Sequence, residues 1–421
     1  MNTSAVEEAA IPDLSDPASF VEGVPHDAFQ ALRARPGLYW QPTDVGTVNG
    51  GYWAVTRFED IVALEKDPST FSSTYGGSYP LMSAERVGPP LSDNLMTNDP
   101  PRHSSLRRVA ATGFGPRIVA NFEPWIRDIV REVIDSVQGL DQFNYVEKFA
   151  RTIPAYVIAR ALGCPAEDRQ KIVDWTMGIF AAAQQDDSAQ GHHGADGHDA
   201  RTASVVEAMQ GMYRYAAEIQ EVKRKEPADD MFTALGSAVD RGELSQPEFI
   251  QWMMLMMAAG FETTHTAIGQ SMRMYLEDPA VRDTTDRAVA EGRTAKLAEE
   301  FIRVITPAMQ MARKAVVDTE LAGTKVSAGD VMVMYFVSAN RDEKAFKNPD
   351  TFDPWRSETA TLAFGSGIHR CIGSYLAKLE VQILWEELSA RGEKYRLAGT
   401  PERGWSNFIN QLQSLPVARV R

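Results

Sequence analysis

Cysteine is scarce in this sequence, because 421 residues contain only Cys164 and Cys371. Two cysteines cannot form the disulfide framework of a small secreted protein, and their scarcity fits a reducing compartment. Positive charge is also in short supply: 43 Lys and Arg stand against 57 Asp and Glu, which gives a formal net charge of −14. Since nucleic-acid-binding proteins normally present a basic face, we expect no nucleic-acid partner.

Long apolar runs are missing as well. The longest, WMMLMMAAGF at 252–261, reaches only about half of the length that a bilayer span needs. The first residues, MNTSAVEEAAIPDLSDP, are acidic and lack the apolar centre of a secretory signal. We therefore expect a cytoplasmic protein without a membrane anchor.

Linkers and repeats are absent too, since no stretch rich in proline, glycine or serine divides the chain and no solenoid period is present. The composition, 44% hydrophobic and 24% charged, is that of a globular protein. We expect residues 1–25 to form a loosely structured arm and residues 26–421 to form a single domain. We expect this domain to be monomeric.

The hydrophobic periodicity predicts a mainly α fold with small β-sheets. GYWAVTRF at 51–58 alternates like a strand, and FEDIVALEKDP then becomes helical. Most of 101–277 has the three-to-four residue apolar spacing of helices. Between 314 and 337 the period returns to that of strands, with Gly323 and Gly329 marking turns.

A polar segment at 184–199 interrupts the helical region and predicts a solvated loop or a frayed helix end. It carries three of the seven histidines, His192, His193 and His198. Nothing in the sequence fixes their geometry, so a flexible polar loop is favoured over a metal site.

A long, nearly apolar helix is predicted over 249–279. Its centre is locally unfavourable, since Gly260 costs about 1 kcal/mol relative to alanine. Glu262 follows the apolar run, and the hydroxyls of Thr263 and Thr264 compete for carbonyls one turn back. A widened turn beside an acid and an alcohol suits a small ligand and a proton relay. The alternative is an ordinary helix whose Glu262 faces solvent.

Two sets of charged residues share helical faces. Glu300 and Arg303 are three apart among apolar neighbours, with Arg356 in FDPWR as a candidate third member of a buried ion-pair group. His103 and Arg107 are four apart in NDPPRHSSLRR, which indicates either an anion-binding face or a solvated basic one.

The stretch FGSGIHRCIG at 364–373 places Cys371 between glycines and beside His369, ahead of a helical pattern. Such a cysteine can be a metal ligand, an inert residue, or a nucleophile with His369 as its base. By contrast, Cys164 in ALGCP is expected to be a small buried hydrophobe.

The order of these motifs resembles that of the cytochrome P450 monooxygenases, from about residue 25 to the carboxyl terminus. FGSGIHRCIG is similar to the haem-binding loop of that family at every fixed position, and AGFETT at 259–264 resembles its oxygen-activating helix. Glu300, Arg303 and Arg356 resemble its buried charged group. Two further stretches are similar to bacterial members: ANRD at 339–342 and DPPRHSSLRR at 99–108. A cysteine nucleophile leaves these matches unexplained.

The resemblance implies the cytochrome P450 fold, with haem b (iron protoporphyrin IX) between a long central helix and a cysteine-bearing loop and helix. Cys371 is then the axial thiolate ligand, which releases electron density to the iron. Phe364 is expected to shield the sulfur, and Gly365 lets the backbone approach the porphyrin. Four residues occupy positions that pair with haem propionates in the family: His103, Arg107, Arg313 and His369.

The implied reaction is insertion of one oxygen atom from O₂ into a C–H or C=C bond. Thr263 is expected to hydrogen-bond the oxygen bound at the iron, and Glu262 to supply protons. An apolar pocket wall is expected from Leu255, Ala258, Ala259 and Met309, below a roof at 75–82 and a lid at 172–183. A terpenoid or steroid is therefore the expected substrate, with an aromatic compound or fatty acid as the alternative.

Electrons are expected from a separate ferredoxin and its NAD(P)H-dependent reductase. A patch of Arg102, Arg108, Arg370 and Lys378 is the expected docking face, unless these charges are simply scattered and solvated. Two alternatives within the fold are a peroxide-driven enzyme, which an intact acid–alcohol pair disfavours, and a haem sensor without turnover.

Overall fold

The structure, a computed structural model, describes residues 11–43, 49–74, 94–184, 195–228 and 230–420. The predicted pocket roof at 75–82 lies outside these residues, as do His192 and His193. The predicted lid at 172–183 forms the later part of helix α8, and His198 lies in helix α9 rather than in a loop.

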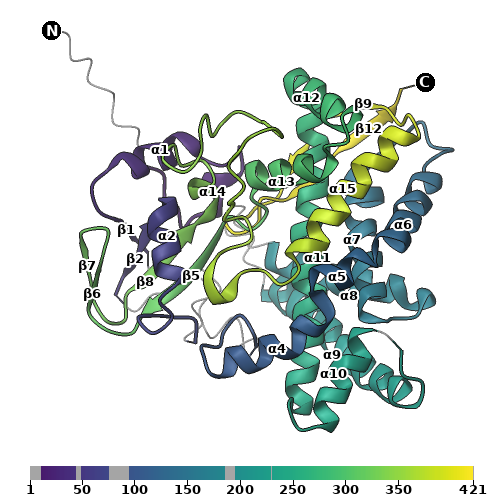
Figure 1. The fold of residues 1–421 in the computed structure, drawn as a ribbon, viewed down its shortest axis with the longest axis horizontal. Coiled ribbons are helices and arrows are strands. Elements are labelled where there is room, and N and C mark those ends of the chain that lie inside the picture. Colours follow the sequence, from purple (N-terminus) through teal and green to yellow (C-terminus); the bar gives the residue numbers. More distant parts are fainter. Residues whose placement is uncertain (1–10, 44–48, 75–93, 185–194, 229, 421) are drawn as a thin grey trace.

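Helices make up most of the described chain, as the sequence predicts (Figure 1). They are α1 (His26–Ala34), α2 (Phe58–Glu65), α4 (Arg102–Phe114), α5 (Pro116–Ala120), α6 (Glu123–Ser136), α7 (Thr152–Leu162), α8 (Arg169–Gln184), α9 (Ala195–Lys225), α10 (Met231–Asp240), α11 (Gln246–Glu277), α12 (Pro279–Ala290), α13 (Thr294–Ile305), α14 (Phe336–Ala339) and α15 (Ser374–Ala390). Four shorter helical segments are η1 (Pro17–Phe20), η3 (Val146–Arg151), η4 (Ala166–Asp168) and η6 (Gly367–His369).

The strands form small sheets, of which the largest has the order β1-β2-β8-β5-β3. Its strands are β1 (Tyr39–Pro42), β2 (Gly51–Val55), β3 (Phe71–Ser72), β5 (Gln310–Ala315) and β8 (Val331–Tyr335). Strands β2 and β8 pair in parallel, with Tyr52 opposite Val331, and the other pairs in this sheet are antiparallel. The smaller sheets comprise β4 (Gln142–Asn144), β6 (Thr319–Leu321), β7 (Thr324–Val326), β9 (Tyr395–Leu397), β10 (Glu402–Arg403), β11 (Leu412–Ser414) and β12 (Pro416–Arg419).

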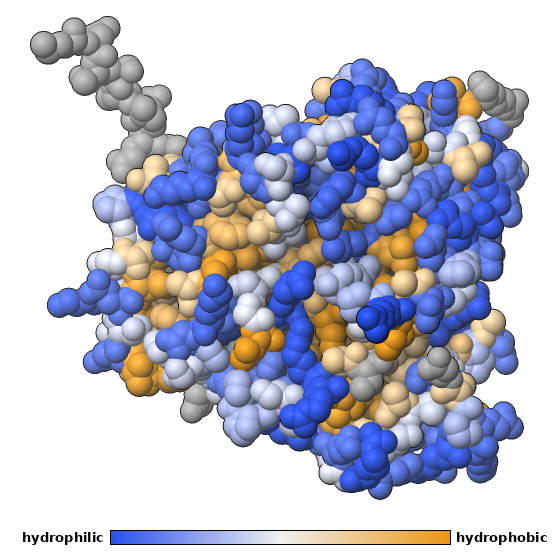
Figure 2. Space-filling model, in the orientation of Figure 1, coloured by the Kyte–Doolittle hydropathy of each residue, from blue (hydrophilic) through white to orange (hydrophobic). Residues whose placement is uncertain are grey.

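The large sheet and helices α1, α2 and α14 occupy one side of the molecule, and the long helices occupy the other (Figure 1). Helix α11 crosses the helical side and packs against α7, α9, α13, α15 and η3. On the face drawn in Figure 2, polar residues cover the periphery, and apolar residues come to the surface in patches toward the middle. Among the described residues, no helix combines the length and the apolarity that a bilayer crossing requires.

Helix α11 begins at Gln246, slightly before the predicted start at 249. Ser245 and Glu248 form a capping box: the Glu248 amide donates to the Ser245 hydroxyl, and the Glu248 carboxylate accepts from the Ser245 amide at 2.7 Å. This reciprocal cap satisfies amides that the first helical turn leaves free, which explains the earlier start.

Residues 11–25 are not the loose arm that the sequence suggested. Leu14 and Phe20 are buried in an apolar cluster against the large sheet. The Asn407 side-chain amide donates to the Leu14 carbonyl at 3.3 Å and to the Ser15 carbonyl at 2.9 Å. Apolar burial and these two hydrogen bonds therefore outweigh the polar character of the segment.

Candidate functional site

The loop at 364–373 leads directly into α15 and turns back on itself. The Cys371 amide donates to the Phe364 carbonyl at 2.8 Å, and the Gly365 amide donates to the Leu362 carbonyl at 2.9 Å. Phe364 is half-buried and packs against the main apolar core. These two hydrogen bonds hold the backbone of the cysteine loop in place just before α15 begins.

Two glycines give the loop its shape. Gly365 has φ +64° and Gly367 has φ +59°, in the left-handed region that side chains disfavour. A Cβ atom at Gly367 would lie 2.2 Å from the backbone carbonyl oxygen of Glu65, which is far inside contact distance. Glycine is therefore required at 367 by both its backbone conformation and its neighbour.

The Cys371 side chain keeps accessible surface, although protein atoms surround its sulfur on the other sides. This burial raises the pKa of the thiol, while the Gly373 amide and the charges of Arg107 and Arg370 lower it. A metal ion deprotonates a coordinating thiol outright and so overrides the effect of burial. In contrast, Cys164 is buried and its pKa is raised to about 12, so it behaves as an inert core residue.

Cationic and imidazole side chains gather beside this loop. The rings of His103, from α4, and His369, from η6, lie 4.3 Å apart between centroids. Burial lowers the pKa of His103 to about 4 and that of His369 to about 2, so both rings are neutral near pH 7. Arg107 donates to the Arg370 carbonyl at 2.6 Å, directly before the cysteine.

The members of this cluster differ in how they are bonded. Neither ring nitrogen of His103 has a hydrogen-bond partner among the described residues, whereas His369 Nε2 lies 3.1 Å from the Ser73 hydroxyl. Arg313 is buried, donates to the Ala312 carbonyl at 2.7 Å and lies 3.9 Å from a Glu65 oxygen. Because buried donors are costly without acceptors, the cluster suits a ligand with anionic oxygens. The two propionates of a haem meet that need, and the thiol of Cys371 suits its iron.

Helix α11 presents one accessible stripe in an otherwise buried middle section. Leu255, Ala258 and Thr263 are half-buried and Ala259 is exposed. The Thr263 hydroxyl donates to the Ala259 carbonyl at 2.8 Å, which is the competition for a carbonyl one turn back that the sequence predicts. The accessible surface is apolar except for this hydroxyl.

Glu262 does not face solvent, contrary to the alternative reading of the sequence, since only 3% of its surface is exposed. Its Oε1 atom lies 3.6 Å from His265 Nδ1, beyond hydrogen-bond distance. Glu262 Oε1, both His265 ring nitrogens and the Thr266 hydroxyl are buried without hydrogen-bond partners among the described residues. The sequence analysis overlooked His265, which the three-residue spacing from Glu262 indicates.

Met309 does not lie on the accessible stripe. It has no exposed surface and packs in the apolar cluster below the large sheet, with Tyr52, Val333 and Tyr335. That Met309 lines the pocket stays a prediction. The half-buried residue beside it is Ala308, which pairs with Ile409 in an isolated bridge.

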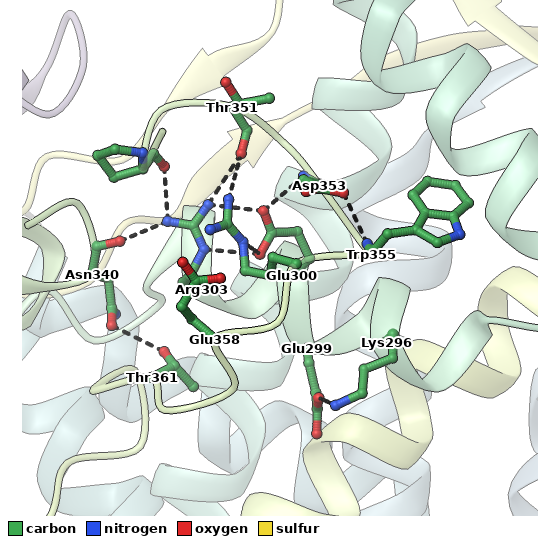
Figure 3. A network of polar contacts seen from close by, with 12 residues as sticks. Lys296, Glu299, Glu300, Arg303, Asn340, Thr351, Asp353, Trp355, Glu358 and Thr361 are labelled. Carbon is green, nitrogen blue, oxygen red and sulfur yellow. Dashed lines mark hydrogen bonds and ion pairs between the residues drawn. The ribbon is translucent and has the colours of Figure 1, made fainter. Parts of the chain in front are cut away.

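Glu300, Arg303 and Arg356 form the buried charged group that their spacing predicts (Figure 3). Glu300 accepts two bonds from Arg303, both 2.8 Å, and one from Arg356 at 2.9 Å. Its Oε1 also accepts the Asp353 amide at 2.8 Å. Arg303 donates further to the carbonyls of Asn340 at 2.6 Å and Pro349 at 2.9 Å.

Asn340, of the ANRD segment, connects this group with the cysteine loop. Its side-chain oxygen accepts the Thr361 hydroxyl at 3.0 Å (Figure 3) and the Leu362 amide at 2.7 Å, and its amide donates to Thr306 at 2.8 Å. The charged group therefore fixes the chain immediately before Phe364.

Glu65 is a second residue that the sequence analysis missed. It is the last residue of α2, and its carboxylate accepts the Ser366 amide at 2.6 Å and the Ser366 hydroxyl at 2.7 Å. An acidic residue at a helix carboxyl terminus opposes the helix dipole, and that local conflict is the signal by which it could have been found.

The predicted basic patch is only partly available. Arg102 pairs with Glu248, and Lys378 pairs with Glu299 at 3.0 Å. Arg108 and Arg370 are exposed. Pairing therefore reduces the positive charge of this face to less than the sequence suggests.

The chain matches known proteins along nearly its whole length. A model of the family "Cytochrome P450" matches residues 78–388. Linalool 8-monooxygenase of Pseudomonas putida is 30% identical over 417 residues, which cover 97% of this chain and 99% of that protein. Steroid C26-monooxygenase of Rhodococcus jostii is 30% identical over 425 residues, covering 97% of this chain and 86% of that protein.

Solved structures are similar to the same extent. A cytochrome P450 of Mycobacterium marinum, in complex with pseudoionone, has a TM-score of 0.85 and 28% identity, covering 99% of this chain and 100% of that one. A crystal structure from Novosphingobium aromaticivorans has a TM-score of 0.84 and 28% identity, covering 97% of this chain and 99% of that one.

Proposed function

This chain belongs to the cytochrome P450 family, and from that membership we propose that it oxygenates an apolar terpenoid or steroid at the stripe on α11. The family's enzymes are oxidoreductases that carry haem b and require O₂, a source of electrons and a substrate. The observation that carries the proposal is the accessible Cys371 in its glycine-shaped loop, beside His103, whose ring nitrogens lack partners among the described residues.

Cys371 is the proposed ligand of the haem iron. The amide of Gly373 and the charges of Arg107 and Arg370 stabilise negative charge on its sulfur. When bound, the haem supplies an iron centre at which O₂ is activated, and an anionic sulfur ligand favours cleavage of the O–O bond.

His103, Arg107, Arg313 and His369 are the proposed partners of the haem propionates. Arg313 keeps its charge because a guanidinium does not deprotonate in proteins, so a propionate offers it a buried acceptor. The two histidines are neutral, and each therefore donates through one ring nitrogen. Two charged arginines and two neutral imidazoles would thus match the two carboxylates without excess positive charge.

Thr263 and Glu262 are the proposed proton-handling residues. The Thr263 hydroxyl, bonded to the Ala259 carbonyl, lies on the accessible stripe and would become available there as a donor by breaking one hydrogen bond. Glu262, its neighbour in sequence, is buried, and its Oε1 atom has no hydrogen-bond partner among the described groups. This arrangement keeps a proton source close to the reaction and apart from bulk water.

An apolar substrate is proposed because the stripe offers Leu255, Ala258 and Ala259 and carries no charged side chain in its described part. Relatives named for linalool and for a steroid support the class, as does the pseudoionone complex. An aromatic compound or a fatty chain is the alternative within the same fold.

The experiment is a spectral titration of the haem protein with a panel of terpenoids, steroids, aromatics and fatty acids. A ligand that displaces water from the iron shifts the Soret band. We expect saturable shifts with members of the first two classes. A response confined to fatty acids or to aromatics would replace the proposed substrate class with the alternative.

A ferredoxin is the proposed electron donor, docking at the exposed Arg108 and Arg370 near the cysteine. Complementary charge on an acidic ferredoxin would accelerate the encounter.

A further inference from the structure

Glu65 occupies a position that is unfavourable for a carboxylate. It is the carboxyl-terminal residue of α2, where the helix dipole repels negative charge, and only 5% of its surface is exposed. Burial raises the pKa of the carboxyl, while Arg313 and Ser366 lower it. A glutamine or an apolar residue would satisfy the helix better, so the acid is retained at a cost in stability.

The Glu65 carboxylate is hydrogen-bonded to the cysteine loop. Oε2 accepts both the Ser366 amide, at 2.6 Å, and the Ser366 hydroxyl, at 2.7 Å. The backbone carbonyl of Glu65 touches Gly367, the next residue, so closely that no Cβ atom would fit. One residue of α2 therefore fixes two successive residues of the loop that ends in Cys371.

The other carboxylate oxygen faces the arginine of the propionate cluster. Oε1 lies 3.9 Å from Arg313 Nη2. Burial lowers the pKa of Arg313, and Glu65 and then Asp99 counter that effect. The Asp99 carboxylate already accepts the Ser73 amide at 3.0 Å and the Ser72 hydroxyl. Glu65 is therefore the main countercharge of Arg313 within the protein.

We propose that Glu65 is a positioning residue of the haem site: it anchors Ser366 through one oxygen and, through the other, limits the positive charge that Arg313 offers to a propionate. The thiolate loop and the propionate cluster are thereby set by a single side chain. This inference rests on the proposed haem site, since it assumes that Cys371 and Arg313 face the cofactor.

The test compares four holoproteins: wild type, Glu65→Gln, Glu65→Ala and Ser366→Ala. Glutamine keeps an oxygen that accepts from Ser366 and removes the negative charge. The Ser366 variant is the matched control, because it removes one hydrogen bond from the loop and leaves the Glu65–Arg313 pair intact. The readouts are the ferrous-to-ferric ratio at a fixed applied potential, haem transfer to excess apomyoglobin, and unfolding of the apoprotein in urea.

We expect Glu65→Gln to raise the ferrous-to-ferric ratio about tenfold, because losing a buried anion near the iron favours the added electron. Its apoprotein should be as stable as wild type or more stable. Ser366→Ala should leave the ratio within about twofold of wild type, because it changes no charge. In Glu65→Ala, which also releases the loop, haem transfer should be about tenfold faster.

An unchanged ratio in Glu65→Gln, with haem bound, would overturn the proposal. An equal change in Ser366→Ala would also overturn it, because the effect would then come from the loop alone. Should Glu65→Gln not retain haem, Glu65→Asp decides: haem retention with a wild-type ratio supports the charge role, and failure rejects it. An error in the haem site itself is seen earlier, as a wild-type ferrous carbonyl spectrum without thiolate character.

Discussion

The Glu300 group and the Cys371 region differ in how completely their polar atoms are bonded. Both carboxylate oxygens of Glu300 and the guanidinium of Arg303 are bonded within the protein. In the Cys371 region, the buried ring nitrogens of His103 lack partners among the described residues, as does an oxygen of Glu262 in α11. The contrast separates charges that support the fold from buried polar groups that are left for a ligand.

The difference has an energetic meaning. A buried ion pair is tolerated only if further hydrogen bonds offset its desolvation, and the Glu300 group meets that condition with backbone groups alone. Donors without acceptors cost free energy in the unliganded protein, and they recover it when an anion binds. Substitutions in the Glu300 group should therefore lower the stability of the protein. Substitutions in the Cys371 region should instead impair haem binding or activity and leave the stability of the apoprotein nearly unchanged.

The largest effect is expected from Cys371→Ala. Oxygenation and the thiolate character of the ferrous carbonyl spectrum should both disappear, because no other described sulfur lies in the loop. The apoprotein should unfold within about 0.5 kcal/mol of wild type, because the side chain makes no structural bond. Urea titration of the apoprotein and the ferrous carbonyl spectrum measure these two outcomes. A thiolate spectrum retained in Cys371→Ala would show that another residue binds the iron.

Glu300→Ala should have the reverse signature. Removing one partner leaves Arg303 and Arg356 buried without their countercharge, which should lower the free energy of unfolding by about 3–5 kcal/mol. The matched control is Glu299→Ala, next to it in α13, whose ion pairs with Lys296 and Lys378 are partly exposed. That control should cost less than about 1 kcal/mol. Equal losses in the two variants would contradict the contrast.

Thr263→Ala should reduce coupled product formation about a hundredfold while haem and substrate binding remain. Electrons would then leave as hydrogen peroxide, because the hydroxyl that orients proton delivery is gone. Product and peroxide are measured per NADH consumed. Thr264→Ser, at the neighbouring buried position, is the control and should stay coupled. Full coupling in Thr263→Ala would show that the hydroxyl has another role.

His103→Leu should speed haem loss about tenfold without destabilising the apoprotein, because it removes donors that only a ligand satisfies. It should also change the pH dependence. The pKa of His103 falls from 6.5 to about 4 on folding, so the unfolded chain binds the proton first as pH falls. Wild-type stability from this group is present above pH 6.5 and is lost toward pH 4. Apoprotein unfolding across that window should be less pH-dependent in the variant.

The smallest effect is expected from Arg108→Glu. Reduction by an acidic ferredoxin should slow a few-fold and lose part of its salt dependence, because the residue is exposed and acts only on the encounter. Stopped-flow reduction at two salt concentrations measures both. An unchanged salt dependence would remove Arg108 from the docking face, and Arg102→Gln, whose charge is already paired with Glu248, serves as the control.

The sequence predicted the elements and the charged group well, because both depend on local spacing. Periodicity placed α11 and the strand-rich segment, and the three-residue spacing of Glu300 and Arg303 was sufficient to foresee their pair. The sequence did not foresee that Met309 packs in an apolar cluster with residues of β2 and β8, because that packing joins segments far apart in the chain. Glu65 was missed because its partner, Ser366, lies far along the chain, and no local pattern joins them.

The parallel pairing of β2 with β8 has a consequence for biosynthesis. Strand β2, which contains Tyr52, can pair with β8 only after the ribosome has synthesised Val331 and the residues that follow it. At about 5–20 residues per second, roughly 15–55 s pass on the ribosome before the partner emerges. Strand β2 therefore lacks its β8 neighbour for most of translation, although its other neighbour, β1, is made before it.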